Sequence, residues 1–171
     1  MRHFPAFLDL QGRTALVLGE GEAADIKAGF LSRAGATLRR TPRFSPELLE
    51  GCAVAVGAGA PEDDLRALSA ACMARGVPVN IVDRTELCSF ITPAIVERAP
   101  ITIGISTGGA APVLARQIRA RIEAILPPAI GKVAALADRF KAAVRAALPD
   151  VAARRRFLDA ALTGPAADLA V

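Results

Sequence analysis

Residues 13–40 read RTALVLGEGEAADIKAGFLSRAGATLRR, and this stretch decides the fold. Its apolar run at 14–18 predicts a short buried strand. An apolar spacing typical of a helix follows and ends at Gly35, and residues 36–40 predict a second strand. A strand, a helix and a strand of this combined length predict a right-handed parallel crossover.

The alternation of strands and helices continues toward the C-terminus. Residues 52–57 and 77–83 predict two further strands, and the helix predicted between them ends at Gly76. Such alternation indicates an α/β fold, in which helices cover the faces of a parallel sheet. We therefore predict an α/β domain at residues 1–90.

The pattern changes after this domain. Residues 91–126 hold two short β-rich runs around Pro100 and an amphipathic helix that begins at Pro112. Residues 127–171 are rich in Ala and Arg with helical spacing, which predicts a C-terminal helical domain. A four-strand unit cannot easily cover the apolar residues of 91–126, so we expect a second subunit to bury this segment.

The composition, 53% hydrophobic and 22% charged, is typical of a folded protein, and the net charge of +4 favours a polyanionic partner. Seven Phe with neither Trp nor Tyr offer few faces for stacked bases, so we predict no nucleic-acid partner. Cys52, Cys72 and Cys88 form no C-x-x-C pair and His3 is the one histidine, which disfavours a disulfide framework and a zinc site. No apolar run reaches the roughly 18 to 20 residues of a membrane helix, and we expect a cytoplasmic protein with no membrane partner.

The turn after the first predicted strand carries a phosphate-binding pattern. Gly19, Gly21 and Ala24 fit G-x-G-x-x-A, in which the first glycine makes the turn and the second lets a pyrophosphate approach the backbone. A tight turn that binds nothing is the alternative. Where such sites often carry an acid for the ribose, this chain has Arg39 and Arg40, which indicates a 2′-phosphate, a solvated strand end or no dinucleotide.

Asp83 ends the fourth predicted strand, where ligands of open parallel sheets collect, so its carboxylate is a candidate general base. The alternative is a helix N-cap, because Glu86 three residues later completes a capping-box pattern. Residues 106–109, STGG, predict either a backbone nest for an anion or a plain turn. Arg116 and Arg119 lie on one helical face and meet either an anionic ligand or solvent.

Three long blocks carry a resemblance to a known family. HFPAFLDLQGRTALVLGEGEAADIKAGFL, VNIVDRTELCSFITPAIVER and ISTGGAAPVLARQIRARIE, in this order, resemble the precorrin-2 dehydrogenase and sirohydrochlorin ferrochelatase module of siroheme synthase. The resemblance runs from about Phe4 to Phe157. It implies a Rossmann-like NAD-binding domain at 1–90, a dimerisation segment at 91–126 and the helical domain at 127–171.

The resemblance also implies an activity. Members of this family form homodimers and use NAD to oxidise precorrin-2 to sirohydrochlorin, and many then insert ferrous iron as a second substrate. Both tetrapyrroles are polycarboxylates, which suits an arginine-rich chain. On this basis we expect NAD rather than NADP.

Site residues follow by position from the same resemblance. Asp83 is the expected catalytic residue, because oxidation and metal insertion both release protons. No metal-ligating residue is expected. The expected cofactor-binding residues are Gly19, Gly21, Glu22, Ala23, Arg40, Thr41, Gly57 and Gly59. The expected substrate-binding residues are Ser106, Thr107, Gly108 and Arg116.

The chain departs from the family pattern at three places. After Arg40 it passes almost directly to the third strand, whereas related modules carry an additional strand and loop. Thr107 stands where relatives commonly have serine, and GAGAPEDD replaces a loop that is often Ala-Ala-Thr-Asp-like. Two alternatives therefore remain open: a chelatase without dehydrogenase activity, and a non-catalytic dimer that binds tetrapyrroles or nucleotides.

Overall fold

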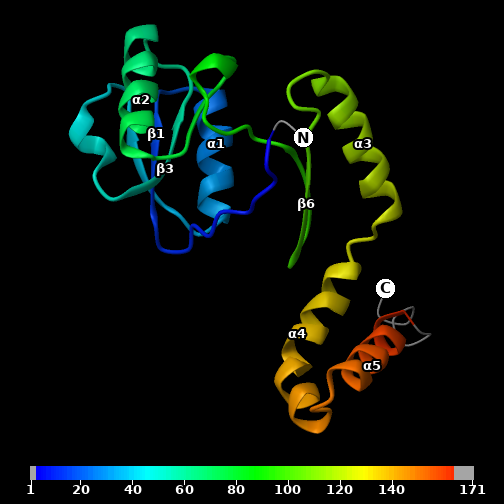
Figure 1. Cartoon of the computed structure of the whole chain (residues 1–171). Coiled ribbons are helices and arrows are strands. Elements are labelled where there is room, and N and C mark those ends of the chain that lie inside the picture. Colours follow the sequence, from blue (N-terminus) through cyan, green and yellow to red (C-terminus); the bar gives the residue numbers. More distant parts are fainter. Residues whose placement is uncertain (1–2, 164–171) are drawn as a thin grey trace. The chain divides into compact units, whose positions relative to one another are not determined.

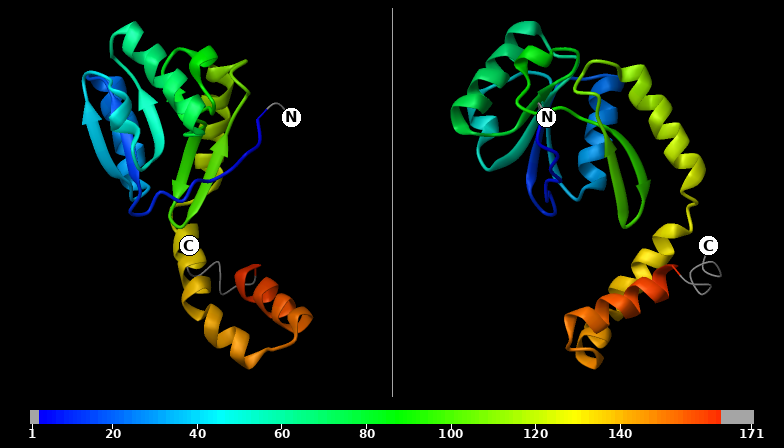
Figure 2. Two further views of the ribbon diagram at one scale, coloured as in Figure 1. Left: turned by 60° about the vertical axis from the view of Figure 1, so that its left-hand side comes forward. Right: turned by 45° about the vertical axis from the view of Figure 1, so that its right-hand side comes forward.

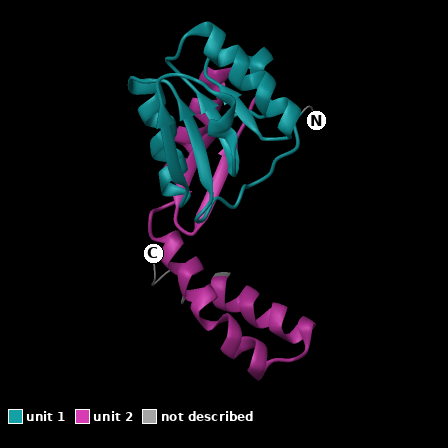
Figure 3. Cartoon of the chain, turned by 90° about the vertical axis from the view of Figure 1, so that its left-hand side faces the viewer, with its two compact units in different colours: residues 1–92 teal, residues 93–171 magenta. Residues whose placement is uncertain are grey.

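The structure, a computed structural model, describes residues 3–163 (Figure 1). The chain divides into two compact units, residues 1–92 and residues 93–171 (Figure 3). Each unit has its own secondary structure. The last residues of the predicted helical domain, 164–171, lie outside the described part of the chain.

The first unit is a four-stranded parallel sheet with the strand order β2-β1-β3-β4. The predicted Rossmann-like α/β fold is confirmed. Its elements are β1 (Thr14–Leu18), α1 (Glu22–Arg33), β2 (Thr37–Thr41), β3 (Cys52–Gly57), α2 (Glu62–Arg75) and β4 (Val79–Ile81), with two short 3₁₀ turns, η1 (Pro46–Leu49) and η2 (Thr85–Leu87).

The two helices cover opposite faces of this sheet (Figure 1). Side chains of a strand alternate between faces, so Ala15 and Val17 of β1 pack with α1, whereas Leu16 and Leu18 pack with α2. All four are fully buried. Burial on both faces explains why β1 is an unbroken apolar run rather than an alternating one.

The fourth strand is shorter than predicted. We expected it at residues 77–83, but β4 covers Val79–Ile81. The chain leaves the sheet at Asp83, whose φ of 61° is incompatible with an extended strand. This left-handed residue ends the ladder and turns the chain into η2.

The second unit begins with the antiparallel hairpin of β5 (Ala94–Arg98) and β6 (Ile101–Ile105). Helix α3 (Pro112–Ile125) packs against this hairpin, and α4 (Ile130–Ala147) and α5 (Val151–Thr163) follow as a helical pair (Figure 2). The Arg98 guanidinium joins hairpin and helix, because its Nε donates to the carbonyl oxygen of Leu126 at 3.0 Å.

Large apolar side chains remain exposed on the three helices of the second unit. They are Val113, Leu114, Ile125, Leu136, Phe140, Val151, Phe157 and Leu162. No helix within residues 3–163 is long and apolar enough to cross a membrane.

Candidate functional site

The strand order defines where this sheet can bind a ligand. The chain moves from β1 outward to β2 and then crosses back to place β3 on the other side of β1. Between β1 and β3 the direction of winding reverses, and ligands of open α/β sheets bind outside the carboxyl ends of strands at such a switch point. Gly19 follows β1 and Gly59 lies in the loop after β3, so both predicted glycines flank this point.

The turns that follow β1 and β3 are in direct backbone contact. A Cβ atom at Gly19 would overlap the carbonyl oxygen of Ala58, and one at Gly59 would overlap the carbonyl oxygen of Glu20. The Gly19 N–H donates to the carbonyl oxygen of Thr41 at 2.8 Å, which ties the end of β2 to the same place. The structure thus brings together Gly19, Gly59 and Thr41.

Gly21 fits a phosphate cradle at the start of α1. It is the N-cap residue, with φ 87° and ψ −179°, a backbone conformation that essentially only glycine adopts. Among the described residues, nothing lies within 4 Å of a Cβ at this position, and no side chain caps the first turn. The N–H groups of a helix start favour an anion, so Gly21, Glu22 and Ala23 fit a dinucleotide phosphate.

Gly57 has a different reason to be glycine. It is buried at the end of β3, where a Cβ would meet the Leu65 and Ile81 side chains at 2.6 and 2.8 Å. Its small size therefore lets α2 and β4 pack together. This packing alone explains the glycine at position 57. The cofactor contact at Gly57 stays a prediction.

The two arginines of β2 are held in different ways. The Arg39 guanidinium donates to the carbonyl oxygens of Leu48 and Glu50, in the connection to β3. The Arg40 guanidinium lies 2.6 Å from the Asp25 carboxylate of α1, and both side chains are partly exposed. Exposed ion pairs contribute little to stability, so of the two only Arg40 can readily turn to a ligand.

Asp83 is exposed at the end of the fourth strand, at the carboxyl edge. The alternative that it caps a helix is wrong. The N-cap of η2 is Arg84, and in the described chain no side chain donates or accepts a capping hydrogen bond there. The reason is the left-handed turn at Asp83 itself, a conformation in which Asp and Asn are enriched several-fold among non-glycine residues.

A polar network beneath this turn was missed from the sequence. Lys27 Nζ of α1 donates to Thr92 Oγ1 at 2.8 Å, and Thr92 Oγ1 donates to Asn80 Oδ1 at 3.3 Å. Burial lowers the pKa of the Lys27 amine, and the nearby Cys88 and Asp83 act in the opposite direction. Two signals in the sequence were available: Lys27 interrupts the buried stripe of α1, and Asn80 interrupts an apolar strand.

The predicted substrate residues all belong to the second unit. Gly108 N–H donates to Ser106 Oγ at 3.0 Å and Ala111 N–H donates to Thr107 Oγ1 at 3.2 Å, at the turn that precedes α3. Each hydroxyl accepts one of these bonds, so its own O–H group can donate to an acceptor such as a carboxylate. Arg116 is exposed on α3.

The second unit carries more positive charge than the first, although one of its arginines is paired. Arg119 is bound to Glu123 on the same helix at 3.0 Å, which favours the solvent-facing alternative for this residue. Eleven Lys and Arg but six Asp and Glu follow residue 92, whereas ten and eleven precede it. The positive charge of the chain therefore belongs to the second unit.

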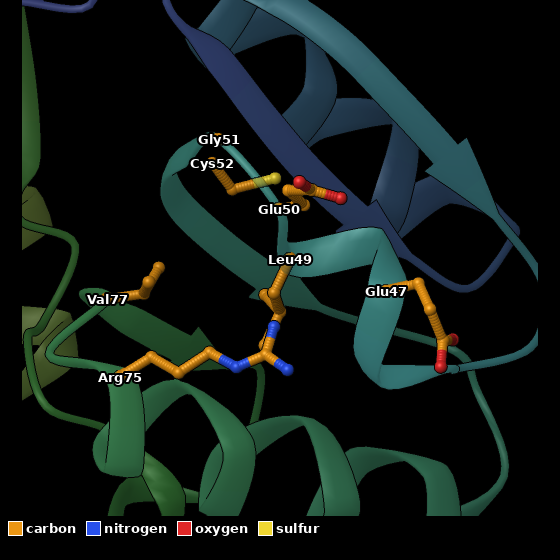
Figure 4. A pocket seen from close by; sticks show the side chains of 7 residues that line it. All are labelled: Glu47, Leu49, Glu50, Gly51, Cys52, Arg75 and Val77. Atoms are coloured by element: carbon orange, nitrogen blue, oxygen red, sulfur yellow. The ribbon is translucent and has the colours of Figure 1, made fainter.

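A surface pocket of about 520 Å³ lies at the opposite, amino-terminal end of β3 (Figure 4). Burial raises the pKa of the Cys52 thiol there, so this sulfur is a poor nucleophile. None of the predicted site residues lines it. The lining residues are Glu47, Leu49, Glu50, Gly51, Cys52, Arg75 and Val77. Within residues 3–163, no group of His, Cys, Asp and Glu could hold a metal ion.

Three family models match successive parts of the chain. Residues 37–94 match the family described as "Putative NAD(P)-binding", and residues 98–125 match "Sirohaem biosynthesis protein central". Residues 129–171 match "Sirohaem synthase dimerisation region". The segment that we expected to dimerise, 91–126, lies before the region that carries this description.

The chain is also similar to curated and solved proteins. Siroheme synthase 1 of Halorhodospira halophila is 42% identical over 191 residues, covering 98% of this chain and 40% of that protein. The siroheme synthase of Chromobacterium violaceum is 40% identical over 189 residues, with the same coverage. The chain thus spans about two fifths of the length of these relatives. Among solved structures, SirC, precorrin-2 dehydrogenase, has a TM-score of 0.75 at 18% identity, covering 94% of this chain and 89% of that chain, which is a likeness of fold.

A Rossmann-like unit followed along the chain by these central and dimerisation regions defines a class of siroheme-biosynthesis modules. Along nearly its whole length the chain is similar to part of these siroheme synthases, and residues 98–125 and 129–171 match the two sirohaem family models.

Replacing Gly21 with Ala tests the phosphate cradle. We expect Gly21→Ala to lower the free energy of unfolding by ~1–3 kcal/mol, the strain of a side chain in this conformation. It should also weaken binding of a nicotinamide dinucleotide, since the methyl group enters the cradle. Denaturant unfolding and titration calorimetry measure the two effects.

Gly12 provides a matched control for this variant. It also has a positive φ, 69°, with nothing within 4 Å of a Cβ among the described residues, but it precedes β1 at the other end of the strand. Gly12→Ala should strain the backbone and leave cofactor binding intact. Equal loss of binding in both variants would contradict the assignment of the cradle.

Proposed function

We propose that this chain is a precorrin-2 dehydrogenase, which oxidises precorrin-2 to sirohydrochlorin with a nicotinamide dinucleotide. The observation that carries the proposal is the open glycine cradle at the switch point, with the Asp83 carboxylate on the same edge of the sheet. Similarity to siroheme synthases and the match to the sirohaem synthase dimerisation region support the choice of substrate.

In the proposed reaction the protein supplies binding, orientation and a proton acceptor. The bound dinucleotide supplies the hydride acceptor. The N–H groups at Glu22 and Ala23 bind its pyrophosphate, and Gly19 and Gly59 hold the two adjoining turns together. Asp83 accepts a proton that the macrocycle loses together with the hydride, because aromatisation removes both.

We assign NAD rather than NADP as the cofactor. Arg39 is engaged by two backbone carbonyls of the β2–β3 connection, which takes one of the two candidate phosphate ligands out of use. Arg40 and Thr41 at the end of β2 remain as contacts for the ribose region. Asp25 beside Arg40 adds a negative charge that disfavours a 2′-phosphate.

The second unit is the proposed binding surface for the tetrapyrrole carboxylates. Ser106, Thr107 and Gly108 offer hydroxyl and backbone donors before α3, and Arg116 offers a guanidinium on that helix. The excess of positive charge after residue 92 supports a polycarboxylate ligand. Ferrous iron is the further substrate if the same site also chelates.

A chelatase without dehydrogenase activity is the second candidate, and one observation favours it. Only residues 42–51 connect β2 to β3, with a single 3₁₀ turn. In the alignment with the Halorhodospira protein, at least 20 of the 191 positions carry no residue of this 171-residue chain. A shortened cofactor wall would weaken dinucleotide binding without touching the tetrapyrrole surface.

Cofactor titration and an anaerobic assay distinguish these two functions. We expect saturable binding of NAD by calorimetry, weaker binding of NADP, and NAD-dependent conversion of precorrin-2 under anaerobic conditions. Iron insertion into sirohydrochlorin without binding of either dinucleotide would support the chelatase and overturn the dehydrogenase.

Asp83 variants test the proposed proton acceptor. Asp83→Asn keeps a residue that tolerates the left-handed turn, so we expect an unchanged melting temperature and a rate of oxidation lowered by about 10²- to 10⁴-fold. Asp83→Gly relieves the backbone and removes the side chain, and it should be equally inactive and at least as stable.

Asp83→Ala completes the series. Its backbone strain should lower stability by ~1–2 kcal/mol, so comparison with Gly separates strain from chemistry. Anaerobic rates and denaturant unfolding are the measurements. Full turnover by Asp83→Asn would remove this carboxylate from the mechanism.

The proposed assembly is a homodimer. Introducing one charged residue in each candidate segment tests which segment forms the interface. Phe140 of α4 and Leu114 of α3 are about equally exposed, at 49% and 47%. We expect a dimer in sedimentation at micromolar concentration. Phe140→Glu should yield monomers if α4 and α5 form the interface, and Leu114→Glu should do so if residues 91–126 form it, because either change buries an unpaired charge.

Met73→Glu is the control, since Met73 is 50% exposed on α2 of the first unit. This variant should remain dimeric. A wild-type chain that stays monomeric would contradict the proposed assembly.

A further inference from the structure

The segment that follows β4 is held on the sheet by hydrogen bonds on both sides of Asp83. Val79 N–H donates to Ser89 Oγ at 2.8 Å, and Ser89 N–H donates to the Val79 carbonyl oxygen at 2.9 Å. Asn80 Nδ2 donates to the Phe90 carbonyl oxygen at 3.1 Å. Residues 82–92 therefore form a loop that returns along β4, with Asp83 at its start.

The ammonium group of Lys27 reaches the end of this loop from helix α1. Lys27 projects from α1 and donates to Thr92, which in turn donates to Asn80. Asn80 lies on the α1 side of the sheet, because its neighbours Val79 and Ile81 pack with α2. The chain of donors runs from the lysine through the Thr92 hydroxyl and the Asn80 amide to the loop backbone.

The position of Lys27 is not explained by stability. It lies within the buried stripe of α1 made by Ala24, Ala28 and Leu31. Partial burial of an ammonium is unfavourable unless it is well paired, and in the described structure the hydrogen-bond partner of the half-buried Lys27 is a neutral hydroxyl. A methionine would fill the same space without a charge.

The groups that raise the pKa of Lys27 lie on the loop. β1 and β3 present Ala15, Val17, Val54 and Val56 to α1, and Arg40 of β2 is paired with Asp25. Cys88 and Asp83 are the groups that interact with the ammonium electrostatically. The proposed proton acceptor is therefore one of the groups that stabilise the Lys27 ammonium.

We propose that Lys27 is a positioning residue for Asp83: through Thr92 and Asn80, and by direct attraction, its ammonium holds the 82–92 loop and the Asp83 carboxylate in place for proton transfer. The proposal rests on the proposed role of Asp83 in oxidation. It assigns to α1 a second task beside binding phosphate at its N-terminus.

The charge of Lys27 has opposite consequences for stability and for activity. Its folded-state pKa lies below that of the unfolded chain, so between the two values the unfolded state binds more protons and stability rises with pH. Below that window the ammonium lowers stability. Activity should instead fall as pH rises through the lowered pKa, because the ammonium that positions Asp83 is lost.

Two substitutions at Lys27 test the proposal by pH profile. Lys27→Met should lower kcat for precorrin-2 oxidation by about 10- to 100-fold, leave binding of the dinucleotide unchanged, and melt no lower than the wild type at neutral pH. Lys27→Arg should keep activity and move the alkaline limb of the profile upward, because guanidinium stays protonated. Arg66→Met on α2 is the control and should match the wild type in rate and profile.

A labelling experiment tests the same contact without any turnover. The pH dependence of Lys27 acetylation, followed by mass spectrometry, reports the pKa of its amine. Asp83→Asn should lower that pKa further, because the Asp83 carboxylate raises it, whereas Asp63→Asn on α2 should leave it unchanged.

The outcomes separate the two proposals. An amine pKa that does not respond to Asp83→Asn, or wild-type kcat and profile in Lys27→Met, overturns the positioning role. If the wild-type chain does not oxidise precorrin-2, the proposed function fails, and the acetylation result still decides whether Lys27 and Asp83 act as a pair.

Discussion

The close approach of two turns is the constraint on which the first unit depends. Because Gly19 leaves no Cβ against the Ala58 carbonyl, the turns after β1 and β3 touch, and the winding of the sheet reverses at that contact. Helix α1 starts directly after this turn, at the carboxyl edge, where Gly21 leaves an open cradle. Close contact of the two turns at the switch point therefore requires glycine at positions 19 and 59.

Lys27, Thr92 and Asn80 form a polar seam between α1 and β4. Packing of the turns requires the glycine contact, whereas this seam places polar groups in an apolar layer and lowers the stability of the fold. Asn80 is 7% exposed and Lys27 is half-buried, so both have lost water on the α1 face of a sheet that is otherwise apolar there. Their hydrogen bonds offset part of that desolvation. This seam lies under the exposed carboxylate of Asp83, which is itself in a left-handed turn. Proteins tend to carry function at the places where they depart from good packing.

The elements of the fold follow from local sequence, whereas several roles at the site do not. Both faces of β1 are buried, and an unbroken apolar run such as TALVL reports this directly. The sequence left Asp83 between a general base and a helix N-cap, because Glu three residues later completes a capping box, and only the backbone of the structure excludes the cap. Lys27 was not predicted as a site residue, because the helix was predicted from the spacing of its apolar residues and this criterion ignores a single charged residue on the same face. Gly57 matched a cofactor loop, but the Leu65 and Ile81 side chains that require it are distant in sequence.

The connection after β2, residues 42–51, lies nearer to one end of the proposed cofactor than to the other. Residues 42–51 lead from the carboxyl end of β2 to the amino end of β3, and Leu49 packs on the α2 face of the sheet. Arg39 fastens this connection by its backbone carbonyls, which leaves β2 as the open edge. In a Rossmann-like site the ribose of the adenosine half lies at the end of β2, and the pyrophosphate lies at the start of the first helix. This connection therefore concerns the proposed contacts to adenosine, whereas the proposed cradle at Gly21 and the Asp83 carboxylate follow β1 and β4.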